Sequence, residues 1–160
     1  MNKIVKIAAV STLAIMTVFN PIASASHHHH HHHSSTEVSN KDNTKIKVDT
    51  KHNRIYLYRK INGKWKKVKS EKCSTGKNGK TKKGTYKSKS KQKSFSKNGK
   101  DYNYVTYFDG NKAIHSTPYD GKYDNSSLGH SRSNGCVRVK PETAKWIYDN
   151  VKKGTTIEVD

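Results

Sequence analysis

The chain has 160 residues, and its 32 Lys and Arg against 12 Asp and Glu give it a formal net charge of +20 at pH 7. This length fits one domain and leaves little room for a second. So strong a positive charge attracts polyanions, but no motif of interleaved aromatic and basic residues accompanies it, and we therefore expect no nucleic-acid binding.

Residues 1–25 have the three parts of a secretory signal peptide. Lys3 and Lys6 lie in a basic start, residues 7–19 are an apolar run, and Ala-Ser-Ala at 23–25 fits the cleavage site. The apolar run is shorter than the roughly 20 residues that span a bilayer, and no later stretch is longer. We therefore expect a secreted protein that is extracellular or associated with the cell wall.

Residues 26–43 are expected to precede the folded domain. Seven histidines at 27–33 indicate a purification tag rather than a metal site, and the polar, aperiodic residues that follow suit a linker. The sequence therefore predicts one domain over residues 44–160.

Alternation of apolar and polar residues predicts strands at the start of this domain. The pattern occurs at 46–48 and again at 55–58, with a turn at 51–53 between them. A second turn at 61–63 leads into a third strand over 65–73. One face of this sheet should lie on the core.

The middle of the domain combines a polar tract with further strands. Residues 76–100 are rich in Lys, Ser and Gly, and propensity alone predicts disorder there. A strand pattern returns at 102–108 and at 113–115, separated by a turn at 109–111.

The only predicted helix lies near the end of the chain. Pro141 suits its first position, apolar residues recur at helical spacing up to Val151, and Gly154 is placed to end it. A last strand is predicted at 155–159. We therefore expect a mainly β fold, a sandwich or partly open barrel with one helix packed outside. Trp65, Trp146 and Tyr148 are expected to lie in the core or against the helix.

Cys136 has the surroundings of a nucleophile. It follows Gly135 in a loop of Ser, Asn, Gly and basic residues and begins the alternating run 137–139, which predicts a strand. A free thiol with a pKa of ~8.5 is mostly protonated at neutral pH, so such a cysteine needs a base to form the thiolate. His115 and His130 shortly precede it. Gly135 allows a sharp turn, after which successive amides could converge on an oxyanion.

Three separated segments resemble the catalytic domain of the L,D-transpeptidases, a peptidoglycan cross-linking family. IHS at 114–116, LG at 128–129 and SNGCVR at 133–138 resemble its active-site motif, I-H-G or I-H-S followed after a variable loop by S-H-G-C-I-R. CSTGKNGKTKKGTY at 73–86 resembles its S-T-G…T-P-x-G-x-[FY] segment, and GTTIEV at 154–159 its terminal strand. Asn134 and Lys82 depart from these patterns, since the family often has His and Pro there.

The resemblance implies the β-sandwich of that family and a catalytic set within it. Cys136 would be the nucleophile and His115 its base, with the backbone carbonyl of Ser116 holding the second imidazole nitrogen. Gly135 would supply an oxyanion-hole amide. The residues expected to contact substrate are Arg138, Asn134, Ser133, Tyr119 and His130. Tyr119 and Tyr123 are candidates for a lid or a groove wall.

The implied function is that of a peptidoglycan L,D-transpeptidase. Cys136 would attack the bond between the third residue of a tetrapeptide stem and its terminal D-Ala and would release D-Ala. The side-chain amine of another stem's third residue would resolve the thioester to give a 3→3 cross-link, or water would resolve it in a carboxypeptidase reaction. No cofactor or metal is needed. The expected partners are peptidoglycan stem peptides and anionic wall polymers, and a monomer is expected.

Two alternatives stand beside this one. In an exported protein Cys73 and Cys136 could form a disulfide, which would stabilise the fold by about 4 kcal/mol. The protein would then be a noncatalytic cationic module that binds the cell wall. In the other alternative His115, His130 and Cys136 bind zinc, although their spacing is not a recurrent zinc motif.

Overall fold

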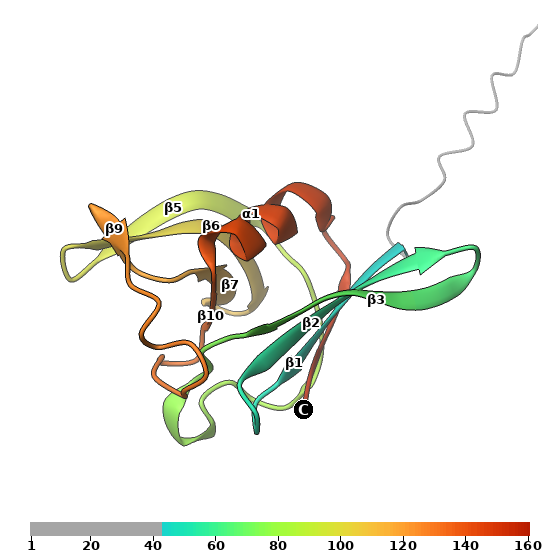
Figure 1. Ribbon diagram of the computed structural model, residues 1–160, viewed down its shortest axis with the longest axis horizontal. Helices are drawn as coiled ribbons and strands as arrows, with labels where there is room; N and C mark the ends of the chain where they lie inside the picture. The colour runs from blue at the N-terminus through green and yellow to red at the C-terminus, as the bar shows by residue number, and fades with distance from the viewer. Residues whose placement is uncertain (1–42) are drawn as a thin grey trace, which may run out of the picture. The chain divides into compact units, whose positions relative to one another are not determined.

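The computed structural model describes residues 43–160 (Figure 1). The predicted signal peptide, the His tract and the linker up to residue 42 lie outside this part. No helix in residues 43–160 is long and apolar enough to cross a membrane.

Five strands form a first sheet, called sheet A here. They are β1 (Thr44–Asp49), β2 (Arg54–Ile61), β3 (Lys64–Lys72), β4 (Gly84–Lys87) and β11 (Thr156–Val159). Their order is β3-β2-β1-β11-β4, in which β1 and β11 are parallel and the other neighbours antiparallel. Ile46 and Val48 are buried on β1, and so are Ile55 and Leu57 on β2. The alternation that predicted these strands therefore places one face of sheet A on the core, as expected.

Six strands form a second sheet, called sheet B here. They are β5 (Lys91–Lys97), β6 (Lys100–Asp109), β7 (Lys112–Ser116), β8 (Tyr119–Asp120), β9 (Lys122–Tyr123) and β10 (Val137–Val139). Their order is β10-β7-β6-β8-β9, with β5 paired to β6. β10 runs parallel to β7, which places Arg138 opposite His115. This pairing brings the two halves of the predicted active-site motif together.

The core lies between the two sheets and α1 (Pro141–Asn150), the one α-helix in residues 43–160 (Figure 1). α1 packs on β6 and β7, and the Thr143 hydroxyl donates a hydrogen bond to Glu71 on β3, so the helix also contacts sheet A. Pro141 is the first helical residue, as predicted. The mainly β class with two sheets and one helix is thus confirmed.

The predicted helix end at Gly154 was wrong. α1 ends at Asn150, and Val151 follows in an extended conformation with φ −86° and ψ 121°. Val151 is fully buried in the core. Leaving the helix at this point buries Val151 among the apolar residues of the core, and Gly154 instead lies, at φ +90°, in the turn before β11.

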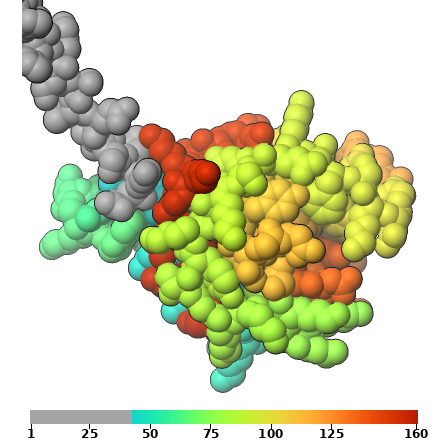
Figure 2. Space-filling view, turned by 180° about the vertical axis from the view of Figure 1, so that it is seen from behind, coloured from blue at the N-terminus to red at the C-terminus, as the bar shows by residue number. Residues whose placement is uncertain are grey.

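The prediction of disorder over 76–100 was also wrong. The segment forms a short 3₁₀ turn (Lys77–Gly79) and the strands β4 and β5. β4 pairs with β11 and β5 with β6, so these polar strands gain backbone hydrogen bonds from strands that the core already fixes. On the face shown in Figure 2, this yellow-green segment covers much of the surface.

The prediction that Trp65 lies in the core or against the helix was wrong. Trp65 is 41% exposed because it pairs with Lys60 of β2 on the face of sheet A that is turned away from the core. Trp146 does pack against the core, and the ring of Tyr148 contacts that of Tyr104 with the centroids 5.9 Å apart.

Candidate active site

A cavity of about 250 Å³ lies beside Cys136, and we call it the Cys136 cavity. The β5–β6 hairpin and the β6–β7 turn form part of its wall, and the loop before β10 forms the rest. Five of the predicted site residues line it: His115, Ser133, Asn134, Cys136 and Arg138. The structure therefore gathers most of the predicted site around one hollow.

The strand register explains why Cys136 and His115 share this cavity. Val137 pairs with Ile114 and Arg138 with His115 in parallel strands. Val137 and Ile114 are fully buried on the core side. Because side chains alternate along a strand, Cys136, Arg138 and His115 lie on the opposite face.

His115 is held in one tautomer by its own backbone. The ring is 2% exposed, and its Nδ1 lies 2.7 Å from the carbonyl oxygen of Ser116. A ring nitrogen that faces a carbonyl oxygen must carry the hydrogen, so Nδ1 donates and Nε2 keeps its lone pair. This is the contact that the resemblance implied for Ser116, and it leaves Nε2 able to accept a proton.

Aromatic rings enclose the imidazole. The centroids of Phe95 and Tyr102 lie 5.3 and 5.0 Å from that of His115, and both rings meet it edge to face. Burial lowers the pKa of His115 to about 4; the Ser116 carbonyl opposes this shift, and the Arg138 cation adds to it. His115 is therefore neutral at physiological pH.

The Cys136 thiol is also held in its neutral form. Burial raises the pKa of Cys136, while a hydrogen bond from the Ala113 amide and the cations Arg138, Lys97 and Lys112 act in the opposite direction. The sequence led us to expect an imidazole that holds Cys136 as a thiolate. The structure instead has a resting thiol whose Sγ lies 4.0 Å from the Asn111 carbonyl oxygen, and a neutral imidazole in the same cavity, because His115 is buried and Cys136 is partly buried.

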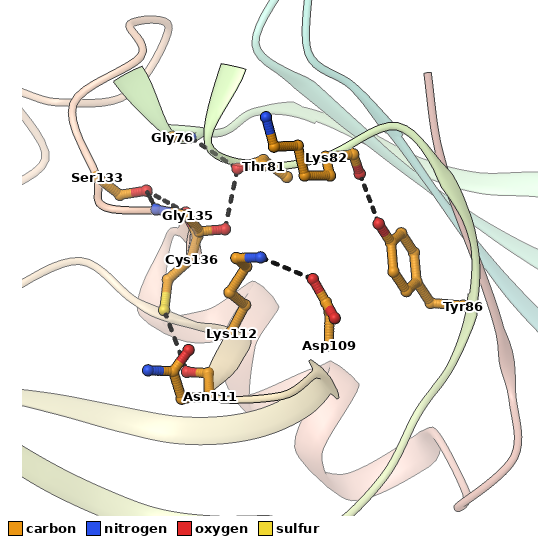
Figure 3. Close-up of polar contacts among 10 residues, drawn as sticks. All are labelled: Gly76, Thr81, Lys82, Tyr86, Asp109, Asn111, Lys112, Ser133, Gly135 and Cys136. Carbon is orange, nitrogen blue, oxygen red and sulfur yellow. Dashed lines mark hydrogen bonds and ion pairs between the residues drawn. The ribbon is translucent and has the colours of Figure 1, made fainter. Parts of the chain in front are cut away.

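Ser133 fixes the backbone around the nucleophile. Its hydroxyl accepts a hydrogen bond from the Gly135 amide at 3.0 Å and donates one to the Cys136 carbonyl (Figure 3). The Gly135 amide, predicted to bind an oxyanion, is therefore already engaged, and it serves that role only if this bond is exchanged. The amides of Asn134 and Cys136 are the other candidate donors in this loop.

A second segment clamps the same loop from the other side. Ser74 exchanges backbone hydrogen bonds with Arg138, and Gly76 bridges to Ser133. The Thr81 hydroxyl accepts from the Gly76 amide at 2.7 Å and donates to the Gly135 carbonyl at 2.9 Å (Figure 3).

Two glycines permit this close approach. A Cβ on Gly76 would lie 2.6 Å from the Thr81 nitrogen and 2.9 Å from the Gly135 Cα. Gly135 itself has φ +126°, which L side chains rarely adopt, and a Cβ there would lie 3.0 Å from the stem of Lys112. The glycine of the S-T-G segment is thus required by packing against the glycine that precedes Cys136.

Arg138 brings an unpaired cation to the cavity. Its Cζ lies 5.7 Å from the centroid of the Tyr102 ring, and its buried Nε has no hydrogen-bond partner within residues 43–160. Lys97 and Lys112 also line the cavity, and no Asp or Glu does. Lys112 is paired with Asp109 at 2.7 Å. The cavity therefore favours an anionic ligand.

Two predicted substrate contacts lie elsewhere. Tyr119 is 36% exposed on β8 and packs on Tyr123, with the centroids 4.9 Å apart. His130 is exposed, and its amide donates to the Ser127 carbonyl. Neither lines the Cys136 cavity, so this geometry does not support their predicted contact with substrate.

The sequence did not point to several residues that build the site. Phe95 and Tyr102 enclose His115, Lys112 packs under Gly135, and Thr81 holds the Gly135 carbonyl. Thr81 belongs to the T-x-x-G part of the quoted segment, so its place in the motif was a usable signal. Phe95 lies in the tract predicted to be disordered, and no local pattern marks it.

The structure does not favour the alternatives. Cys73 and Cys136 are both free thiols, and burial raises the pKa of Cys73 to about 12. Within residues 43–160, no three His, Cys, Asp or Glu side chains are grouped so that they could hold a metal ion. His130 in particular does not join His115 and Cys136 at the cavity.

The comparison with family models identifies one family. The model of the L,D-transpeptidase catalytic domain matches residues 43–159. L,D-transpeptidase 2 of Mycobacterium tuberculosis (strain CDC 1551 / Oshkosh) is 40% identical over 47 residues, which are 29% of this chain and 10% of that protein.

Solved structures show the same fold. A fused Zn-dependent amidase/peptidase/peptidoglycan-binding domain-containing protein from Clostridium acetobutylicum ATCC 824 has a TM-score of 0.62 and 28% identity, covering 74% of this chain and 52% of its own. An L,D-transpeptidase from Mycobacterium smegmatis has a TM-score of 0.61 and 20% identity, with 74% and 58% covered. This chain thus spans little more than half the length of these solved relatives and a tenth of the curated one.

The neutral resting state of His115 and Cys136 leads to a prediction of how the Cys136 thiol reacts with iodoacetamide. Only the thiolate is alkylated, and its fraction rises about tenfold per pH unit below the pKa. We expect the alkylation rate to follow this slope between pH 6 and 9, measured by mass spectrometry on a Cys73→Ser variant. A pH-independent rate below pH 7 that disappears in His115→Ala would instead reveal a preformed thiolate and imidazolium pair.

The two hydrogen bonds of the Thr81 hydroxyl, to Gly76 and Gly135, predict that removing this hydroxyl destabilises the fold. Thr81→Val keeps the shape but leaves the buried Gly76 amide and Gly135 carbonyl unpaired, so the free energy of unfolding should fall by about 2 kcal/mol or more. Thr81→Ser keeps the hydroxyl and should cost less than about 1 kcal/mol. Urea unfolding compares the two. Equal losses would show that the hydroxyl does not carry this contact.

Proposed function

The chain belongs to the L,D-transpeptidase catalytic domain family, which acts on peptidoglycan stem peptides, and we propose that it is itself a cysteine acyltransferase of this kind. The observation that carries the proposal is the shared cavity of Cys136 and His115, in which Ser116 leaves the imidazole Nε2 free to accept a proton. The proposed substrate is a tetrapeptide stem that ends in D-Ala.

The proposed acylation starts from the neutral pair. Nε2 of His115 removes the thiol proton as Sγ of Cys136 attacks the carbonyl carbon between the third stem residue and the terminal D-Ala. The imidazolium then donates that proton to the departing amine, the carbon–nitrogen bond breaks, and D-Ala leaves. The low pKa of His115 favours this second transfer, because the buried imidazolium is a strong acid.

The oxyanion of the tetrahedral intermediate needs donors that are fixed before the reaction. The amides of Asn134 and Cys136 are the proposed pair, since Ser133 engages the Gly135 amide. Ser133 and Thr81 hold the carbonyls of Cys136 and Gly135, so the backbone that carries these amides does not have to reorganise.

The proposed second step transfers the acyl group. The side-chain amine of another stem's third residue attacks the thioester, loses a proton to His115, and forms the 3→3 cross-link while the Cys136 thiol is regenerated. Water in the same position would give a tripeptide, which is the carboxypeptidase reaction. The open cavity admits either acceptor.

Arg138 is the proposed site for a substrate carboxylate. Stem peptides carry free carboxylates. The Arg138 guanidinium lines a cavity without Asp or Glu, and its acidic neighbour Asp124 interacts with it only beyond ion-pair distance. Its planar donors match a carboxylate in a bidentate manner. The terminal D-Ala carboxylate is the group expected there, because it lies one residue beyond the bond attacked by Cys136.

The proposed setting is outside the cytoplasm, as the predicted signal peptide implies. Anionic wall polymers are proposed as further partners of the basic surface, and a monomer is proposed. The noncatalytic alternative requires a disulfide that the two free thiols do not support.

Mass spectrometry of a disaccharide-tetrapeptide incubated with the protein tests the chemistry. We expect loss of D-Ala with formation of a dimer or a tripeptide, and a loss of about 1,000-fold or more in both Cys136→Ala and His115→Ala, because nucleophile and base act as a unit. Cys73→Ser serves as the matched cysteine control and should retain turnover. Turnover that survives in Cys136→Ala would exclude the proposed nucleophile.

The role of Arg138 predicts a change in substrate preference. Arg138→Gln should lower kcat/KM for the tetrapeptide acid by about tenfold or more, since a hydrogen bond to a charged group contributes about 1.5–3 kcal/mol. The same variant should change kcat/KM little for a tetrapeptide with a C-terminal carboxamide. Equal losses on both substrates would show that Arg138 does not bind this carboxylate.

A further inference from the structure

The outer face of sheet A carries three aromatic rings, of which Trp65 is exposed and Tyr56 and Tyr58 are partly exposed. Tyr58 lies opposite Lys45 on one side and Lys67 on the other, and Trp65 lies opposite Lys60. These residues alternate with the buried Ile55 and Leu57, so they point away from the core. We call this surface the aromatic–lysine face. It consists of Lys45, Tyr56, Tyr58, Lys60, Trp65 and Lys67.

The helix covers the other side of the sheet. Arg59 of β2 lies over the Trp146 ring at 5.1 Å and donates to Asn150, both on α1. Arg59 alternates with Tyr58 and Lys60, so α1 packs on the inner face only. The aromatic–lysine face therefore remains open along β1, β2 and β3.

The ammonium groups of the lysines on this face lie close to the aromatic rings. Lys45 Nζ lies 5.4 Å from the centroids of both Tyr58 and Trp65, and Lys60 Nζ lies 5.8 Å from that of Trp65. Lys67 Nζ lies 5.3 Å from the Tyr56 centroid. Each ring is thus bordered by at least one ammonium group within cation–π distance.

The acidic residues nearby do not neutralise this face. Glu158 pairs with Lys45 at 3.6 Å, whereas Lys60 and Lys67 have no carboxylate within ion-pair distance in the described chain. Trp65 is 41% exposed although exposing an indole to water is unfavourable. A surface that only kept the protein soluble would need the lysines but not the three rings.

We propose that the aromatic–lysine face binds an anionic glycopolymer, a phosphate-linked chain that carries sugar rings. The apolar C–H faces of the sugar rings would stack on Trp65 and Tyr58, and the phosphates would contact Lys60 and Lys67. Rings and cations alternate within a few ångströms, as the sugars and phosphates of such a polymer do. Charge complementarity on a face with two unpaired lysines selects a polyanion over a neutral polysaccharide.

This face is separate from the catalytic cavity. Figure 1 shows the β2–β3 hairpin on one side of the fold and the β5–β6 hairpin and β9 on the other. A polymer bound along β2 and β3 would leave the Cys136 cavity open. The proposed binding is therefore independent of the proposed reaction, and either one can fail without the other.

The test uses a poly(glycerol phosphate) probe that bears glucosyl substituents. Its Kd is measured by calorimetry at about 0.15 M salt, together with those of the same polymer without sugars and of a single-stranded oligothymidylate. Trp65→Ala should weaken binding of the glucosylated polymer about tenfold and change binding of the bare polymer little, because only the sugar stacks. Lys60→Gln with Lys67→Gln should weaken both polymers.

Matched control variants separate the contribution of the aromatic–lysine face to binding affinity from that of net charge. Lys82→Gln with Lys83→Gln removes the same two charges from an exposed loop and should leave Kd within about twofold. Equal losses in both double variants would reduce the effect to bulk charge and overturn the proposal. Tighter binding of oligothymidylate that Trp65→Ala abolishes would overturn it in favour of a nucleic-acid surface. Circular dichroism spectra and urea unfolding should be unchanged in all of these variants, which shows that they are folded whether or not the proposed reaction occurs.

Discussion

Backbone pairing on both sides of the Cys136 loop is the constraint on which the site depends. β10 lies parallel to β7 on one side, and residues 74–76 pair with the loop on the other. These hydrogen bonds join backbone groups and do not depend on side chains, so they fix Cys136 in the same cavity as His115 whatever else the loop carries. Only the two contacts where backbones nearly touch, at Gly76 and Gly135, demand a particular residue.

Burial then determines the protonation states of His115 and Cys136. The rings of Phe95 and Tyr102 exclude water from His115, which disfavours its charged form, and burial disfavours the thiolate of Cys136 in the same way. The same low polarity strengthens every electrostatic interaction that forms once charge develops. In the proposed reaction, fixed amides would therefore be most effective in the transition state, where the resting neutral pair becomes charged.

The basic composition serves two different surfaces. At the Cys136 cavity Arg138 and Lys97 face a hollow without carboxylates, which suits a small anionic group next to the reacting bond. On sheet A the lysines border flat rings, which suits an extended chain. A uniform positive charge would attract polyanions anywhere on the molecule, whereas these two arrangements differ in the shape of ligand that they accept.

The sequence by itself determined the features that depend on local period and residue identity. These are the alternating strands, the helix that begins at Pro141, and the histidine and cysteine motif that marks the family. Tertiary structure alone decided the order of residues 76–100, because polar strands become ordered when β11 and β6 supply hydrogen bonds. It also decided the neutral state of His115 and Cys136, which follows from burial. The interleaving of rings and lysines on sheet A was invisible in the sequence because each ring borders lysines of neighbouring strands, and only pairing brings them together.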